Sequence, residues 1–234
     1  MRASKAVVAI GVAMALTAPL ELSAASRTSL TATSEQWRVV SVPNRKATKF
    51  AIDRTGTMNI RSDMSVAFFV REMKHPQEKV GANTIRNISW QWRVDGDIVV
   101  TDLAHKGGDD RPAAIHLFFG KRQQQAGLFG NWFKRFPPDG FALSYVWGGK
   151  RKAETVIDNP YFDNGKIIIV RTAKDKAGTW RREKRDIAAD LRRAFGDLSP
   201  LGSLRYVAVS GDTDDTQSQS SAKISNLRIT PHTP

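Results

Sequence analysis

The sequence predicts an all-β protein, an antiparallel β-sandwich or jelly roll with one short helix near residues 186–195. Three observations lead to this fold class. Ile88–Val94 alternates apolar and polar side chains with a period of two, which is typical of a half-buried strand. Roughly ten short segments of this kind follow one another, separated by Gly, Pro, Asp and Asn. One segment alone has helical spacing, and no repeated β-helix-β unit is present.

Each predicted strand is short, and their patterns differ. Ala113–Phe119 is apolar on both faces, so we expect this strand at the centre of a sheet. Phe141–Trp147 places its large apolar side chains on one face. The remaining predicted strands are Trp37–Val42, Lys49–Ile52, Thr57–Arg61, Ser65–Val70, Lys166–Arg171, Trp180–Arg185, Leu204–Ser210 and Ala222–Ile229.

The helix is predicted at Asp186–Phe195. Ile187, Leu191 and Phe195 recur on one helical face, Asp186 is a suitable N-cap, and Gly196 follows the last turn. The longest irregular stretch, 121–140, contains Trp132, Phe133 and Phe136 among glycines and basic residues. These aromatic residues either pack over the sheet edge or belong to a functional loop, and the sequence leaves both open.

The N-terminus has the three parts of a secretory signal. Arg2 and Lys5 precede the apolar run 6–16, and the small residues Ser23-Ala24-Ala25 follow Pro19. The apolar run is shorter than the ~20 residues that a membrane-spanning helix needs. We therefore expect residues 1–25 to be a cleaved signal peptide and residues 26–234 to be a single β-sandwich domain without a transmembrane segment. The expected location is the periplasm of a Gram-negative bacterium, or outside the cell.

Composition excludes several classes of protein. The chain has 234 residues and no cysteine, which rules out a disulfide scaffold, a thiol nucleophile and a zinc-thiolate site. It contains no Gly-x-Ser-x-Gly elbow, Walker loop, dinucleotide-binding glycine pattern or His-Glu-x-x-His pair. Only four histidines occur. Of these, His116 lies inside an apolar strand, where we expect a hydrogen-bonded core imidazole.

Two acidic clusters contrast with the net charge of +13. Gly107-Gly108-Asp109-Asp110 precedes an interior strand, and Asp212-Thr213-Asp214-Asp215-Thr216 follows another. We expect Asp109, Asp110, Asp212 and Asp214 to meet at one edge of the sandwich and to form the polar end of a pocket. Such carboxylates can bind Ca²⁺, act as an acid–base pair, or cap turns and pair with arginine.

Four neighbouring carboxylates repel one another, so a positive group must offset them. We expect either Ca²⁺ or arginines such as Arg93 and Arg171 in this role. The spacing does not fit an EF-hand loop, because Gln217 and Lys223 stand where glycine and glutamate are required. No cofactor is therefore expected, apart from the open possibility of a structural Ca²⁺.

Basic residues are concentrated in Lys166–Arg205, most densely at Arg181-Arg182-Glu183-Lys184-Arg185. Basic patches attract phosphates and other anions. Because an exported protein meets no chromosomal DNA, the expected partners are anionic lipid headgroups or acidic glycans rather than nucleic acid. A basic face that is simply solvated is the other interpretation, and the oligomeric state is left open.

The order of several short motifs resembles one family. These motifs are Ser89-Trp90-Gln91-Trp92-Arg93-Val94, Gly108-Asp109-Asp110, Tyr145-Val146-Trp147, Asn159-Pro160-Tyr161, Val170-Arg171, Trp180 with Arg185-Asp186, Asp190, Arg192-Arg193-Ala194-Phe195-Gly196 and Asp212-Thr213-Asp214. Over residues 49–229 the chain is similar to the domain-of-unknown-function family 3047. The resemblance implies an exported bacterial protein with a galactose-binding-like jelly roll. Arg111, Ser144 and Asp215 depart from the family pattern.

Three functions remain open, and we expect binding rather than catalysis. The first is a noncatalytic glycan-binding module, by analogy with the fold. Its candidate ligand-binding residues are Trp92, Arg93, Asp109, Asp110, Tyr145, Trp147, Arg171, Asp212 and Asp214. The second is a carbohydrate-active enzyme that uses Asp110 with Asp212 or Asp214. The third is a structural or adaptor protein of the cell envelope.

Overall fold

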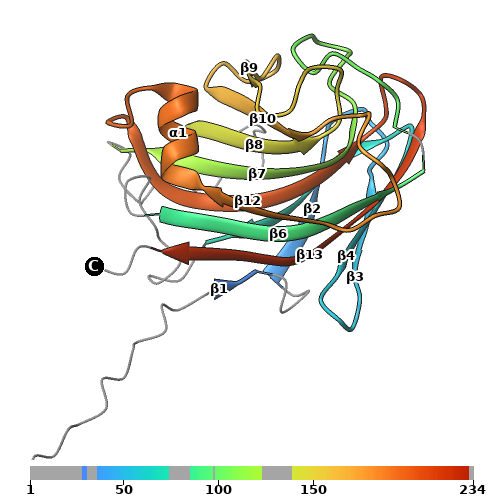
Figure 1. Cartoon of the computed structure of the whole chain (residues 1–234), viewed down its shortest axis with the longest axis horizontal. Coiled ribbons are helices and arrows are strands. Elements are labelled where there is room, and N and C mark those ends of the chain that lie inside the picture. The colour runs from blue at the N-terminus through green and yellow to red at the C-terminus, as the bar shows by residue number, and fades with distance from the viewer. Residues whose placement is uncertain (1–27, 31–35, 74–84, 97, 123–138, 232–234) are drawn as a thin grey trace, which may run out of the picture.

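Two β-sheets face each other across one apolar core, with a single helix at one end (Figure 1). This computed structural model describes residues 28–30, 36–73, 85–96, 98–122 and 139–231. The predicted all-β sandwich with one short helix is confirmed. The signal-like segment 1–25 and most of the 121–140 stretch lie outside the described residues.

The first sheet has six strands. Its order is β11 (Arg181–Asp186), β6 (Ile85–Asp95), β13 (Gln219–Pro231), β4 (Met58–Asp63) and β3 (Lys49–Ile52), and β1 (Thr28–Ser29) also pairs with β13. Every pair is antiparallel. In β4 and β6 apolar residues alternate with polar ones, and in β11 half-buried charged residues alternate with exposed ones, so one face of this sheet is more deeply buried than the other.

The second sheet has seven strands. Its order is β2 (Trp37–Ser41), β5 (Val66–Glu72), β12 (Leu201–Asp212), β7 (Arg111–Lys121), β8 (Phe141–Trp147), β10 (Gly165–Arg171) and β9 (Val156–Asp158). The pair β8 and β10 is parallel, which departs from the all-antiparallel prediction. The intervening β9 makes this possible, because the chain turns back through it before it reaches β10.

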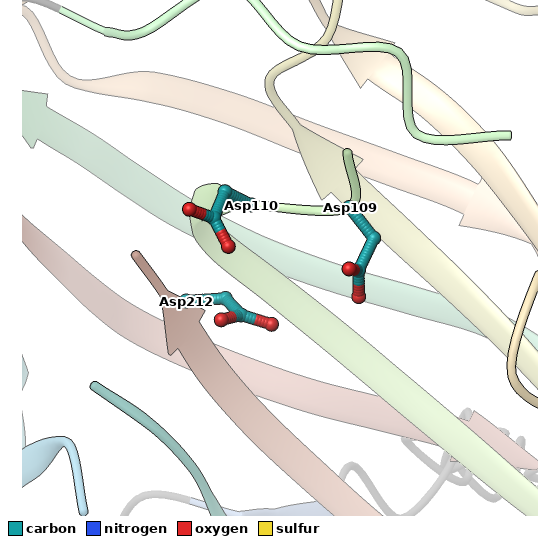
Figure 2. A group of neighbouring side chains, drawn as sticks. All are labelled: Asp109, Asp110 and Asp212. Atoms are coloured by element: carbon teal, nitrogen blue, oxygen red, sulfur yellow. The ribbon is translucent and has the colours of Figure 1, made fainter. Parts of the chain in front are cut away.

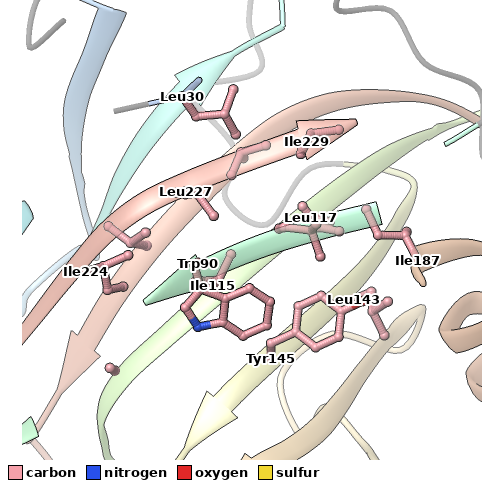
Figure 3. Packing of buried hydrophobic residues seen from close by; sticks show 14 of the residues in the cluster. Leu30, Trp90, Ile115, Leu117, Leu143, Tyr145, Ile187, Ile224, Leu227 and Ile229 are labelled. Atoms are coloured by element: carbon pink, nitrogen blue, oxygen red, sulfur yellow. The ribbon is translucent and has the colours of Figure 1, made fainter. Parts of the chain in front are cut away.

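Large aromatic side chains fill the core between the two sheets. Trp90 and Trp92 of β6 meet edge to face with ring centroids 5.2 Å apart. The ring centroid of Trp90 lies 5.4 Å from that of Tyr145 (Figure 3). The ring centroid of Trp92 lies 5.5 Å from that of Trp147. These contacts join the six-stranded sheet to the seven-stranded sheet, and such pairs contribute about 0.5–1.5 kcal/mol each beyond the apolar area they bury.

Helix α1 (Ile187–Phe195) follows β11 directly and closes one end of the core. The carboxylate of its N-cap, Asp186, accepts a hydrogen bond of 3.0 Å from the amide of Ala189. Ile187 and Leu191 are fully buried in the core. Among the described residues, no helix has the length and apolar character that crossing a membrane requires.

The outer face of the seven-stranded sheet is covered as well. All residues of β7 except Lys121 are buried, although they alternate between the two faces. Leu103, from the segment before β7, packs over Ala114, Val146 and Ile169 on this outer face. The covering segments leave a pocket between themselves and the sheet, and this pocket contains the candidate site.

Candidate functional site

The structure brings the four predicted carboxylates together at one edge of the seven-stranded sheet. Asp109 and Asp110 immediately precede β7, and Asp212 is the last residue of the neighbouring strand β12 (Figure 2). One carboxylate oxygen from each of these three residues lies within 4.8 Å of the other two. The same limit holds for Asp110, Asp214 and Asp215.

Strand register explains this convergence. Strands β7 and β12 are antiparallel neighbours, and Arg111 at the start of β7 is the partner of Asp212 at the end of β12. Gly211 allows β12 to approach β4 closely at this point. A Cβ atom on Gly211 would lie 2.7 Å from both Ile60 Cγ2 and Ser62 Oγ, so a larger residue cannot fit without a shift.

Arginine supplies positive charge to the cluster. Arg111 Nη1 donates to Asp109 Oδ2 at 3.0 Å and to Asp212 Oδ2 at 3.1 Å. Arg45 Nε lies 3.0 Å from Asp214 Oδ2. Arg93 and Arg171, the arginines predicted from the sequence, do not pair with this cluster.

Asp110 has a structural role at the floor of the cluster. It is 3% exposed, and its Oδ2 accepts hydrogen bonds from the amide of Thr216 at 2.7 Å and from the Thr216 hydroxyl at 2.5 Å. The amide of Asp215 donates to Asp110 Oδ1 at 3.4 Å. Asp110 therefore fixes the turn after β12, and that turn positions Asp214 and Asp215.

The environment changes the acidity of two carboxyl groups. Burial raises the pKa of Asp212 to about 9, and the neighbouring Asp214 adds to this increase although Arg111 opposes it. Burial also raises the pKa of Asp215 to about 6, with a further contribution from Asp214. Within the part of the chain that the structure describes, Asp212 Oδ1 is buried and has no hydrogen-bond partner. The raised pKa favours the protonated form of Asp212, which is the form that can donate a proton.

The carboxylates form one wall of a pocket of about 300 Å³ on the outer face of the seven-stranded sheet. Its floor comes from β5, β7, β8 and the end of β12, and its walls come from the loops around them. The lining residues are Val42, Arg45, Val66, Phe68, Asp109, Arg111, His116, Phe118, Ala142, Ser144, Asn159, Tyr161, Phe162, Asp212, Asp214 and Asp215. This volume is at the lower end of the range for small-molecule sites.

His116 lies on the pocket floor between two hydroxyl groups. Its Nδ1 is 2.8 Å from Ser144 Oγ, and its Nε2 is 2.9 Å from Ser210 Oγ. Burial lowers the pKa of His116 well below its usual value, and the nearby Arg111 lowers it further. The ring is therefore neutral and hydrogen-bonded on both sides, as the sequence led us to expect for a core histidine.

Tyr161 forms the exposed aromatic side of the pocket. It is 51% exposed, and its hydroxyl accepts a hydrogen bond of 2.8 Å from the amide of Gly107. Asn159 Oδ1 accepts from the amide of Tyr161 at 2.9 Å, which fixes the turn that carries the ring. The ring is held in place by two loops, and Lys106 Nζ lies over it at 5.8 Å from its centroid.

The predicted aromatic ligand-binding residues lie elsewhere. Trp92, Tyr145 and Trp147 are 0% exposed, because they point into the core between the sheets. Trp92 Nε1 donates to Glu183, and the Tyr145 hydroxyl donates to Asp190. The structure therefore does not bring these three residues to the pocket.

Arg93 and Arg171 also lie away from the pocket. Arg93 pairs with Asp95 on the outer face of the six-stranded sheet, at 2.7 Å. Arg171 Nε pairs with Glu183 Oε1 at 2.8 Å. Each of these arginines already has an acidic partner of its own, which explains why neither serves the Asp cluster.

The cluster contains the oxygen donors that Ca²⁺ prefers, in Asp109, Asp110 and Asp212. Two contacts argue against a cation at this position. Arg111 Nη1 already bridges Asp109 and Asp212, and the backbone and hydroxyl of Thr216 occupy Asp110. Protein groups therefore already contact all three carboxyl groups, while Asp212 Oδ1 is buried without a hydrogen-bond partner in the described chain.

Several pocket residues escaped the sequence analysis. Arg111 directly follows Asp109 and Asp110, and Asp215 follows Asp214, so adjacency to the acidic clusters could have indicated both. Tyr161 had a weaker signal, as part of Asn159-Pro160-Tyr161. Phe68 and Phe118 had none, because only the structure shows that the outer face of their sheet lines a pocket.

Comparison with solved structures finds β-sandwich hydrolases at low similarity. Endoglucanase cel12A from Rhodothermus marinus has 12% identity and a TM-score of 0.49, covering 88% of this chain and 96% of its own. The xyloglucanase domain of NopAA from Sinorhizobium fredii has 10% identity and a TM-score of 0.47, covering 88% and 97%. A family 12 xyloglucanase from Bacillus licheniformis has 7% identity and a TM-score of 0.49, covering 89% and 100%. With TM-scores below 0.5, these likenesses do not bear on the activity of this chain.

Among curated proteins, none matches the sequence. A family model does match it, over residues 35–228, and its description is "Protein of unknown function (DUF3047)". This match spans most of the chain and includes both acidic clusters and Tyr161. The chain therefore belongs to the DUF3047 family.

Proposed function

We propose that the pocket on the outer face of the seven-stranded sheet binds a segment of a glycan. The observation that carries this proposal is the pairing of a carboxylate wall with the accessible ring of Tyr161 in one pocket. Carboxylates accept hydrogen bonds from sugar hydroxyls, and charge-assisted bonds of this kind are the strong ones. An aromatic ring offers a flat apolar surface for the C–H face of a pyranose.

The charge of the pocket favours a neutral, polyhydroxylated ligand. Two guanidinium groups, Arg45 and Arg111, lie beside four carboxyl groups. Burial raises the pKa of Asp212 to about 9, which favours its uncharged form at neutral pH. The remaining imbalance is small, so the pocket neither attracts an anion strongly nor needs a metal ion. Phe68, Phe118 and Phe162 add apolar surface to the lining.

A panel of soluble oligosaccharides, titrated calorimetrically into the purified chain, tests this proposal. We expect Tyr161→Ala and Asp214→Asn each to weaken binding by about tenfold, the equivalent of ~1.4 kcal/mol. Trp180→Ala is the matched control, because Trp180 is 40% exposed and does not line the pocket. The proposal is contradicted if no saccharide binds, or if Trp180→Ala weakens binding while the two pocket variants do not.

Hydrolysis of the bound glycan is a second candidate function. The supporting observation is the raised pKa of Asp212, which makes it a proton donor, next to Asp109 with an oxygen within 4.8 Å. A carboxylic acid beside a second carboxyl group is the arrangement of glycoside hydrolases, and a short separation of ~5–5.5 Å accompanies retention of configuration. Asp110, considered for this pair from the sequence, is engaged by Thr216 instead.

Release of reducing ends from the bound saccharides separates the two candidates. A hydrolase should lose turnover in Asp212→Asn while it retains saccharide binding, because the amide cannot donate the proton. Binding without turnover in the unaltered chain would favour the glycan-binding function alone. Turnover that survives in Asp212→Asn would exclude Asp212 as the acid.

A further inference from the structure

The outer face of the six-stranded sheet carries a diagonal series of basic residues. Register places Lys49 of β3 beside Arg61 of β4, and Lys223 of β13 beside Arg93 of β6. On β11, Arg182 lies opposite Gln91 of β6 in the next row, and Lys184 lies opposite Ser89 in the row after that. We call Lys49, Arg61, Lys223, Arg93, Arg182 and Lys184 the basic track (strands labelled in Figure 1).

Most of the basic track is free of acidic partners. Arg93 pairs with Asp95, but the other five residues form no ion pair with any residue that the structure describes. Lys49, Arg61, Arg182 and Lys184 are exposed. On the same face, Asp63 pairs with Lys46 rather than with the track. The track is thus a line of mostly unpaired positive charge, with Asp95 beside Arg93 and Asp63 near Lys49, and it crosses all five strands of the main path.

The track has the shape of a site for a linear polyanion. Neighbouring strands lie ~4.8 Å apart and same-face residues repeat about every 6.8 Å, so the diagonal from β3 to β11 spans roughly 28 Å. A compact anion would contact one or two of these cations. A chain with regularly spaced negative groups can contact all of them and release its counterions.

The side chains between the cations favour a sugar polymer over other polyanions. Asn59, Gln91, Ser89, Ser221 and Ser225 share this face and offer neutral hydrogen-bonding groups for hydroxyls. Of the large exposed hydrophobic residues in the described chain, Trp180 adjoins the track, and one such side chain offers little apolar surface for insertion into a bilayer. Single-stranded nucleic acid requires successive aromatic rings for stacking, whereas only Trp180, beneath Arg93, adjoins the track.

We propose that the basic track binds an acidic polysaccharide, through its uronate or sulfate groups. This surface is separate from the pocket, since it lies on the other sheet and its residues do not line the pocket. It also assigns a role to the densest basic run of the sequence, because Arg182 and Lys184 belong to that run. The chain would then hold an acidic polymer on one face and present the pocket on the other.

A charge-reversal pair with a matched control tests the track. The test variant is Arg182→Glu with Lys184→Glu, and the control is Lys121→Glu with Lys152→Glu, two exposed lysines outside the track. Both variants change the net charge equally, and all replaced side chains are exposed. Polygalacturonate is the probe, and neutral dextran, phosphatidylglycerol vesicles and single-stranded DNA are the comparison ligands.

We expect polygalacturonate binding that weakens with rising salt, and a loss of about tenfold or more in the test variant against a small loss in the control. Saccharide binding in the pocket should be unchanged in both, which separates this proposal from the one above. Equal losses in the two variants would show a response to net charge alone and overturn the track. Tighter binding to the vesicles or to DNA than to polygalacturonate would overturn the polysaccharide assignment.

Discussion

Arg111 and Asp212 are paired twice, as register partners across β7 and β12 and through a contact of 3.1 Å between Nη1 and Oδ2. Arg111 is 7% exposed and Asp212 is 4% exposed, so this contact is shielded from water. The same guanidinium nitrogen also reaches Asp109. One buried arginine thereby allows several carboxyl groups to share an edge of the sandwich.

Removal of this arginine should destabilise the fold. In Arg111→Ala we expect the free energy of unfolding to fall by roughly 2–3 kcal/mol, less than the about 3–5 kcal/mol lost when a fully ionised buried pair is broken. The loss is reduced because Asp212 can remain protonated. Arg171→Ala is the control: its guanidinium is 30% exposed, and we expect a loss below ~1 kcal/mol. Urea unfolding measures both, and equal losses would contradict the role given to Arg111.

Calcium should not stabilise the protein. Because Arg111 and Thr216 already contact the carboxyl groups of Asp109, Asp110 and Asp212, we expect the melting temperature to be the same in a chelator and in added calcium chloride. A ligand that binds the folded state alone raises the melting temperature by mass action. A calcium-dependent increase that disappears in Asp109→Asn would show that the cluster is a metal site after all.

Stability should fall with pH between 7 and 9 because of Asp212. Its pKa is about 9 in the folded chain and near 3.8 otherwise, so between these values the folded state holds an extra proton. The contribution of Asp212 to stability is then largest below its unfolded pKa and decreases as the pH rises towards 9. We expect a loss on the order of 1 kcal/mol per pH unit, measured by urea unfolding. His116 does not contribute in this range, since its pKa is lowered.

Asp212→Asn should remove this pH dependence. Asp197→Asn is the control, because the pKa of Asp197 is lowered by its hydrogen bonds to Ser199 and it does not titrate above pH 7. If Asp212→Asn and the unaltered chain lose stability in parallel between pH 7 and 9, Asp212 is not the protonated group.

Gly211 should tolerate no side chain. A methyl group there would lie 2.7 Å from Ile60 Cγ2, where β12 approaches β4. We expect Gly211→Ala to destabilise the fold by about 1–3 kcal/mol through overpacking. The control is Gly120→Ala on β7, whose nearest neighbour is the side chain of Arg205 at 3.2 Å, which can move aside. Thermal unfolding compares the two, and a neutral Gly211→Ala would mean that the sheets can separate at this edge.

The sequence predicted the positions of the strands better than the way in which they pair. Phe141–Trp147 matches β8 at both ends, because apolar alternation and flanking glycines mark it clearly. β9, Val156–Asp158, was missed since three residues carry no period, and the parallel pair of β8 and β10 depends on it. No local pattern records such a crossover.

The site was predicted only in part, because local sequence patterns do not show which face of a strand lines the pocket. Asp109, Asp110, Asp212 and Asp214 stood out as clusters beside interior strands, and strand ends do meet at a sheet edge. Alternation shows that Trp147 shares a face with Tyr145 but not which face becomes the core. In β8 both faces are buried, one between the sheets and one beneath loops, so only the structure could separate core residues from pocket residues.

A crystal structure with a bound saccharide tests the proposed function most directly. The chain should be soaked with the oligosaccharide that binds most tightly in the calorimetric panel. The prediction is a sugar ring between Tyr161 and the carboxylates of Asp109 and Asp214, with its hydroxyls within hydrogen-bond distance of them. A saccharide seated elsewhere, with the pocket residues untouched, would contradict the proposed glycan site.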